Sequence, residues 1–247
     1  MKIYCIGCAG GYPMDGHGTT SFVVTDTAGE YHLLMDAGSG SALNIEKYID
    51  VSELDAIWLS HDHPDHAADI GIYQHLLKLK KPAPKKIPVP IYVHPNSVYA
   101  DWLVEDKESK PVVYQPDTHL DLGPFRARFI RTTHPVECYA IRLTERETGK
   151  AFVFTADSGW QDSMVEFAHD ADLLIADTNF SNELGRNAIH MTAEEVATLA
   201  NKANAKKLVA SHIPPQAETG LILGQVTEAL NDSIEFYACR PTEVYEI

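Results

Sequence analysis

The sequence predicts an α/β fold in which two β-sheets pack face to face and helices cover their outer surfaces. Strand-like and helical segments alternate in the first half, a long middle connection follows, and the alternation returns in the second half. Several strand-like segments end directly in a histidine or an aspartate. The 247 residues, 45% of them hydrophobic, are enough to bury a sizeable core.

The first half of the chain is expected to provide four strands before its first long helix. The strands are predicted over residues 2–7, 20–25, 31–36 and 56–59. The second and third form a hairpin that turns over Ala28 and Gly29. After the fourth strand, apolar residues recur at steps of three and four from Ile70 to Leu77, which predicts a helix ending near Lys81.

The middle of the chain is predicted to be extended rather than helical. Residues 80–90 contain four prolines, which exclude a helix and indicate an extended surface connection. The lysines among them are typical of a solvated loop, and a role facing a substrate or a partner stays open. A strand over residues 91–94 follows.

The second half is predicted to repeat the pattern of strands and helices. Strands are expected over residues 125–132, 139–143, 151–155, 172–177, 207–212 and 234–239, and helices over 192–204 and 222–230. Thr192 with Glu195 three residues later predicts a capping box at the start of the first of these helices. No linker divides the chain, so we expect residues 1–247 to form a single domain.

Composition limits the partners and the compartment. The net charge of −15 argues against broad contact with nucleic acid or anionic membranes, which needs a basic face. No segment approaches the ~18 apolar residues of a membrane span, and the amino terminus does not resemble a signal peptide. The four cysteines suggest no disulfide framework, so we expect a cytoplasmic protein. Cys5-x-x-Cys8 is interpreted as small buried residues, with a redox or zinc role as the alternative.

The segment from Ser60 to His66 carries the strongest functional signal. Its last six residues hold three histidines and two aspartates between a buried strand and a helix, where functional residues tend to lie. His61 and His63 are two residues apart, so in an extended segment they point the same way. Pro64 then turns the chain, and Asp65 and His66 project elsewhere. The pattern suits two adjacent metal ions better than a solvated polar loop.

This motif, His61-x-His63-x-Asp65-His66, resembles the signature of the metallo-β-lactamase-fold hydrolases. The resemblance extends over most of the chain, because His134, Asp157 and His212 each follow a strand in the family's order. It implies a four-layer αβ/βα sandwich with the site at one edge, between the sheets. The ligands that it implies are His61, His63 and His134 for the first metal ion, Asp65, His66 and His212 for the second, and Asp157 as the bridge.

The resemblance also implies a supporting residue and a chemistry. Asp36, at the end of a strand, is expected to hold a ligand histidine by its other nitrogen. The nitrogen and oxygen ligands suit two divalent ions, Zn²⁺ first and Mn²⁺, Fe²⁺ or Co²⁺ as competitors. Two such ions would produce a metal-bound hydroxide near neutral pH, which Asp65 would orient as a catalytic residue.

A second motif narrows the expected reaction. His190-x-Thr192 before a helix is similar to the ribonuclease Z and phosphodiesterase branch, which implies His190 as a general acid and phosphate contact. Ribonuclease Z carries a tRNA-binding arm between the equivalents of His134 and Asp157. Here that interval is short and is occupied by a predicted hairpin. The prediction is therefore a phosphodiesterase that acts on a small phosphodiester, with a cyclic nucleotide as one candidate and no nucleic-acid partner.

Three alternatives stay open at this point. The same site could serve a lactonase or thioesterase, a ribonuclease Z-like RNA endonuclease could lack the arm, or a non-catalytic protein could keep the metal as a scaffold. The resemblance also suggests a homodimer.

Overall fold

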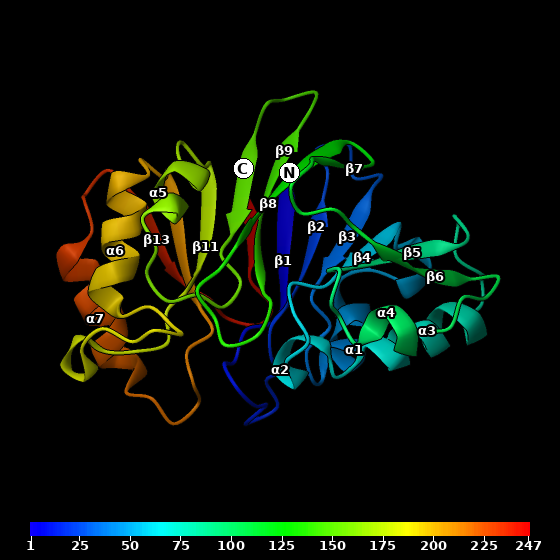
Figure 1. The fold of residues 1–247 in the computed structure, drawn as a ribbon, viewed down its shortest axis with the longest axis horizontal. Helices are drawn as coiled ribbons and strands as arrows, with labels where there is room; N and C mark the ends of the chain where they lie inside the picture. Colours follow the sequence, from blue (N-terminus) through cyan, green and yellow to red (C-terminus); the bar gives the residue numbers. More distant parts are fainter.

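The computed structural model describes residues 1–247 and contains two seven-stranded sheets that face each other (Figure 1). The first sheet has the order β14 (Val244–Glu246), β1 (Lys2–Gly7), β2 (Ser21–Thr25), β3 (His32–Met35), β4 (Ala56–Trp58), β5 (Val89–Val93) and β6 (Ser109–Val113). The second has the order β13 (Glu235–Ala238), β12 (Lys207–Ser211), β11 (Leu173–Asp177), β10 (Ala151–Phe154), β9 (Tyr139–Glu145), β8 (Phe125–Arg131) and β7 (Leu120–Leu122).

Helices cover the outer face of each sheet. On the first sheet they are α1 (Ser41–Asn44), α2 (Pro64–Ala67), α3 (Ile70–Leu79) and α4 (Tyr99–Trp102); on the second they are α5 (Ser163–Phe167), α6 (Ala193–Lys202) and α7 (Thr219–Ala229). In Figure 1 the two groups of helices lie on opposite sides of the molecule, with both sheets between them. The predicted four-layer αβ/βα sandwich is confirmed. No helix has the length and apolar character needed to cross a lipid bilayer.

The buried side chains form three clusters that match the four layers. One cluster of 24 residues fills the space between the sheets and includes Phe22, Trp58 and Phe152. The other two, of 20 and 18 residues, lie between each sheet and its own helices. Residues that alternate along a strand face different clusters, as Val23 and Val24 do on β2. Both faces of the central strands are therefore buried, which explains their continuous apolar runs.

Strand direction determines where the functional residues gather. Strands β3 to β6 run parallel to one another in the first sheet, as do β10 to β13 in the second. Strand β9 is antiparallel to both β8 and β10, so β8 points the same way as β10. Residues that follow β8, β10 and β12 consequently reach the same edge of the second sheet. This is the edge at which His134, Asp157 and His212 lie.

The middle of the chain contains more regular secondary structure than predicted. Residues 89 and 90 belong to strand β5, so a surface connection over the whole of 80–90 was wrong. Pro90 pairs with Lys110 of β6, whereas the pairing with β4 starts only at Ile91. The proline therefore sits where it deprives β4 of no ladder hydrogen bond. Lys80 and Lys85 form ion pairs with Glu46 and Asp55, which attach this segment to the body of the protein.

Three strands and the short helices were not predicted from the sequence. Strands β6, β7 and β14 are edge strands, and each has a single neighbour in its sheet. Half-exposed edge strands carry little alternation, so the partner strand rather than the local pattern determines their conformation. The capping box at Thr192 and Glu195 is present and starts α6 as predicted.

Candidate metal centre

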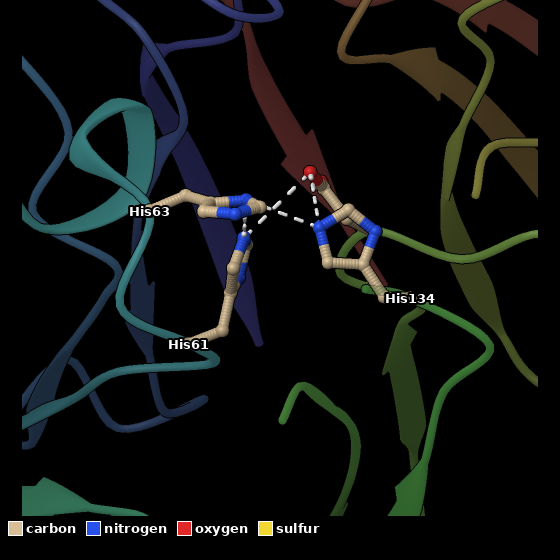
Figure 2. Close-up of side chains that lie close together, drawn as sticks. His61, His63 and His134 are labelled. Atoms are coloured by element: carbon tan, nitrogen blue, oxygen red, sulfur yellow. Dashed lines mark hydrogen bonds and ion pairs between the residues drawn. The ribbon is translucent and has the colours of Figure 1, made fainter. Parts of the chain in front are cut away.

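The first group of site residues contains the three histidines labelled in Figure 2. His61 and His63 come from the loop between β4 and α2, and His134 follows β8. Nδ1 of His63 lies 3.1 Å from Nε2 of His61 and 3.1 Å from Nε2 of His134. Oδ2 of Asp157 approaches these nitrogens, at 3.7 Å from His61 and 3.8 Å from His134. Four potential ligand atoms from three segments of the chain thus converge on one point.

The second group lies on the other side of Asp157 and contains Asp65, His66 and His212. Nε2 of His212 is 3.0 Å from Oδ2 of Asp65. The remaining oxygen of Asp157, Oδ1, is 3.1 Å from Nε2 of His66 and 3.4 Å from Nε2 of His212. Each carboxylate oxygen of Asp157 therefore faces a different group, which is the arrangement expected of a bridging ligand. All seven predicted metal-binding residues are brought together.

The donor atoms fit metal ions in spacing and in chemistry. Nitrogen and oxygen ligands lie about 2.0–2.2 Å from Zn²⁺, so neighbouring ligands of a tetrahedral site are roughly 3.3–3.6 Å apart. Most of the separations in both groups are close to this range. Nε2 of His66 and Oδ1 of Asp157 are buried and have no hydrogen-bond partner. Buried polar atoms without partners are costly, and a bound cation would satisfy both.

The two groups differ in charge before any metal binds. His66 and His212 are buried, which opposes protonation, but Asp157 and other aspartates beside them outweigh this effect. The pKa of His66 is raised well above its usual value, and that of His212 is raised to about 10. Burial and the neighbouring His66 instead lower the pKa of His61, and burial lowers that of His134. Protons therefore compete with a metal ion more strongly in the second group than in the first.

Other residues hold the imidazole rings by their second nitrogen. Nδ1 of His66 lies 2.7 Å from Oδ2 of Asp36, so the structure places Asp36 against a candidate ligand. Asp36 also accepts hydrogen bonds from the backbone and hydroxyl of Ser60, whose Oγ is 3.0 Å from Nδ1 of His61. Nδ1 of His134 donates to the carbonyl of Ile189 at 3.2 Å. These contacts leave the opposite nitrogen of each ring facing the centre.

The ends of three strands adopt left-handed backbone conformations at the centre. The φ values are 57° at Asp36, 50° at Ala156 and 59° at His212. Non-glycine residues rarely occupy this region, and such strain tends to occur at functional sites. Gly10 allows close packing there, because a Cβ atom at this position would lie 2.4 Å from the carbonyl oxygen of His212. The chain thus turns sharply as it leaves the sheet edge and presents its side chains to the site.

His190 lies beside both groups, at ring-centroid distances of 5.4 Å from His134 and 5.3 Å from His212. Its Nδ1 is 2.7 Å from Oδ2 of Asp177, which ends β11. Burial opposes protonation of His190, but the carboxylate of Asp177 raises its pKa above the usual value. Sequence reasoning missed Asp177, although it ends a buried strand shortly before the predicted His190 motif.

The remaining polar residues of the motif region lie outside the centre. Asp62 points away from both groups and accepts hydrogen bonds from Ser97 Oγ at 2.6 Å and from the backbone of Val98 at 2.8 Å. His94 is buried, and its Nε2 lies 3.4 Å from Oδ1 of Asp62. His119 is exposed. Asp62 and His94 therefore hold the loop between β4 and α2 in place, and His119 lies on the surface.

Comparisons with known proteins agree with this geometry. A family model described as the β-lactamase superfamily domain matches residues 31–213. The probable metallo-hydrolase YhfI of Bacillus subtilis (strain 168) is 39% identical over 217 residues, which cover 87% of each chain. The crystal structure of Bacillus subtilis YhfI superposes with a TM-score of 0.89 at 34% identity and covers 99% of both chains.

Two more distant structures share the fold. The short form of human tRNase Z has a TM-score of 0.76 at 18% identity and covers 100% of this chain and 99% of its own. A diphosphatase from the PhnP family has a TM-score of 0.76 at 16% identity, with 100% and 97% coverage. The resemblance inferred from the histidine motif is thereby confirmed. The chain belongs to the β-lactamase superfamily, and it is a metal-dependent hydrolase with the metallo-β-lactamase fold.

Proposed function

We propose that this hydrolase binds two divalent metal ions, Zn²⁺ first among the candidates, and cleaves a small phosphodiester such as a cyclic nucleotide. His61, His63 and His134 would hold one ion, Asp65, His66 and His212 the other, and Asp157 both. The two carboxylate oxygens of Asp157, each facing a different group, support this assignment. When bound, such ions would lower the pKa of water and offset the charge that develops on the phosphoryl group.

The pair formed by His190 and Asp177 carries the assignment to phosphodiesters. A leaving alkoxide needs a proton, and an imidazole whose pKa is raised by a carboxylate can provide one. Asp177 raises the pKa of His190 and orients its ring, while Nε2 remains available to a substrate. A protonated imidazole can also bind a phosphate oxygen through a charge-assisted hydrogen bond.

Asp65 has the geometry to orient the attacking water. Its Oδ2 accepts a hydrogen bond from the backbone of Gly11 at 2.9 Å and lies 3.0 Å from Nε2 of His212. Both contacts use the same oxygen, so Oδ1 is left to accept a hydrogen bond from water. This supports the catalytic role predicted for Asp65.

Two features favour a small substrate over folded RNA. The interval between His134 and Asp157 is occupied by the hairpin of β9 and β10, which pair with each other inside the sheet. The hairpin and the short segments beside it account for the whole interval, so it holds no inserted arm. The net charge of −15 also opposes a grip on tRNA, which depends on basic residues that neutralise phosphates.

Because both sheets contribute to one centre, we propose that residues 1–247 act as one domain. The four free cysteines fit a reducing cytoplasm. A homodimer stays a prediction, which light scattering of the purified protein would test.

The test begins with metal analysis and continues with a substrate panel. The wild type should hold two ions in the histidine and aspartate centre and hydrolyse bis(p-nitrophenyl) phosphate and cyclic nucleotides. It should not process precursor tRNA efficiently, and thioesters and lactones should be poor substrates. Asp157→Ala should lose metal and turnover, whereas the exposed His119→Ala should retain both. Preferential turnover of a lactone, a thioester or precursor tRNA would replace the phosphodiester assignment.

A further inference from the structure

Three of the four cysteines meet at a second place in the structure. The Sγ atoms of Cys5, Cys8 and Cys239 all lie within 4.8 Å of one another, and those of Cys5 and Cys239 are 3.2 Å apart. Cys5 is in β1, Cys8 is in the loop that follows it, and Cys239 comes immediately after β13. The cluster therefore joins residues from opposite sheets and from the two ends of the chain.

The cluster lies where the core between the sheets meets a cavity. Cys5 is fully buried, and Cys8 and Cys239 pack against the core between the sheets. Cys8 and Cys239 also line a cavity of about 460 Å³, which gives an ion and a fourth ligand a way in. The hydroxyls of Ser211 and Tyr245 lie beside Cys239, and both are buried without a hydrogen-bond partner of good geometry.

Hydrogen bonds within the cluster favour negative charge on one of its three sulfurs. Although burial opposes the charge, hydrogen bonds from Cys5 and Cys8 hold the pKa of Cys239 well below its usual range. Burial raises the pKa of Cys5 well above its usual value, and the hydrogen bond with Cys239 raises that of Cys8 likewise. The three sulfurs thus resemble a partly charged soft-ligand site, in which a cation would stabilise the remaining thiolates.

We propose that Cys5, Cys8 and Cys239 bind a third metal ion, of the thiolate-preferring kind, with Zn²⁺ as the first candidate. Sulfur ligands lie about 2.3 Å from Zn²⁺, which places two sulfurs of a tetrahedral site roughly 3.8 Å apart. The observed cluster can reach this spacing with small side-chain movements. Each thiol that binds gives its proton to solvent, and water in the cavity completes the coordination. Asp15 and His17 line the same cavity.

This third ion would stabilise the backbone segments that hold Asp65 and His212 in the dinuclear centre. The carbonyl of Cys8 accepts a hydrogen bond from the backbone of His212 at 3.1 Å. Three residues later in the same loop, Gly11 donates to Asp65. Cys239 starts the segment that crosses from the second sheet to β14 in the first, and backbone hydrogen bonds join Cys5 to Thr242 and Glu243 in that segment. An ion on these sulfurs would tie the crossing to the loop that holds Asp65 and His212.

Cobalt substitution separates this site from the dinuclear centre. The dinuclear centre offers only nitrogen and oxygen ligands, so a thiolate-to-Co²⁺ charge-transfer band in the near ultraviolet reports the cysteine cluster alone. Reduced full-length protein reconstituted with Co²⁺ should show this band and bind three equivalents. Cys239→Ser and Cys8→Ser, at the two half-buried positions, should each lose the band and one equivalent, with the circular dichroism spectrum unchanged.

Two controls make the outcome decisive. Cys138→Ser removes a buried thiol outside the cluster and should keep the band. Asp157→Ala should lose ions from the dinuclear centre but keep the band, so failure of the proposed function would not imitate failure of this proposal. Absence of the band in the reduced wild type, or its persistence in Cys239→Ser, would overturn the site. So would recovery of the wild type as a Cys5–Cys239 disulfide that takes up no third ion after reduction.

Discussion

His190 forms a pair with the buried Asp177, thirteen residues earlier in the chain, in which Nδ1 of the imidazole lies 2.7 Å from Oδ2 of the carboxylate. Strand β11 ends at Asp177, and the backbone of Ser158 also donates to its Oδ2 at 3.0 Å. The carboxylate is therefore fixed by the sheet, and it fixes the histidine in turn. Asp177 is a positioning residue for His190, and its Oδ1 also lies 3.5 Å from Nδ1 of the candidate ligand His212.

Asp177→Asn should shift the alkaline side of the pH profile to lower pH. The carboxylate raises the pKa of His190, so the protonated acid is present below that raised pKa and is lost as pH rises through it. Without the charge, this loss should begin at lower pH, and kcat should fall more than KM changes. Asp172→Asn, at the residue that precedes the same strand, is the matched control. An unchanged alkaline limb in a variant that keeps both metals would remove Asp177 from this role.

His190→Ala should distinguish substrates by their leaving group. A general acid accelerates the reaction by about 10²–10⁴-fold when the leaving alkoxide is basic. It accelerates the reaction little when the leaving group is p-nitrophenolate. We therefore expect a large loss on alkyl phosphodiesters and a small loss on bis(p-nitrophenyl) phosphate, with metal content unchanged. His119→Ala should leave both rates as they are. Equal losses on both esters would leave His190 as a phosphate contact only.

Lowering the pH should remove the two metal ions in sequence. A metal ion needs neutral imidazoles, so protons compete with it most strongly where carboxylates raise the histidine pKa. His66 and His212 have such raised pKa values, whereas His61 and His134 have lowered ones. The ion between Asp65, His66 and His212 should therefore leave at higher pH than the other. Equilibrium dialysis at stepped pH, with metal analysis, would show two separate losses; a single joint loss would contradict this order.

Asp36→Asn should weaken metal binding although it replaces no metal ligand. The carboxylate accepts from Nδ1 of His66, which keeps Nε2 unprotonated and directed at the centre. An amide nitrogen in its place would donate to Nδ1 and move the proton to Nε2, where it blocks the metal. Loss of such a supporting contact typically costs 10–100-fold in metal affinity.

A competition titration with a chelator would measure the effect of Asp36→Asn. Asp55→Asn is a suitable control, because Asp55 is also buried and holds the backbone of His32 instead of a ligand. Wild-type affinity in Asp36→Asn would show that Asp36 has only a structural role.

The sequence by itself determined whatever depends on neighbours along the chain. The candidate ligands from His61 to His66 lie within six residues, so the alternation of the strand and the turn at Pro64 already separate them into two directions. The capping box of Thr192 and Glu195 and the central strands also follow from local pattern. His134, Asp157 and His212 were named from their order and from the family resemblance, since a single residue after a strand carries no signal of its own.

The tertiary structure decided which distant residues meet. Asp177 reaches His190 because the parallel strands bring their ends to one sheet edge. Cys239 joins Cys5, at a separation of 234 residues, because the chain crosses between the sheets after β13. The edge strands β6, β7 and β14 likewise owe their conformation to a single partner strand. Local pattern reports only the burial and turn preference of a segment. The contacts that complete the histidine and aspartate centre and the cysteine cluster come from packing between segments far apart in the sequence. The local pattern of one such segment carries no information about the other.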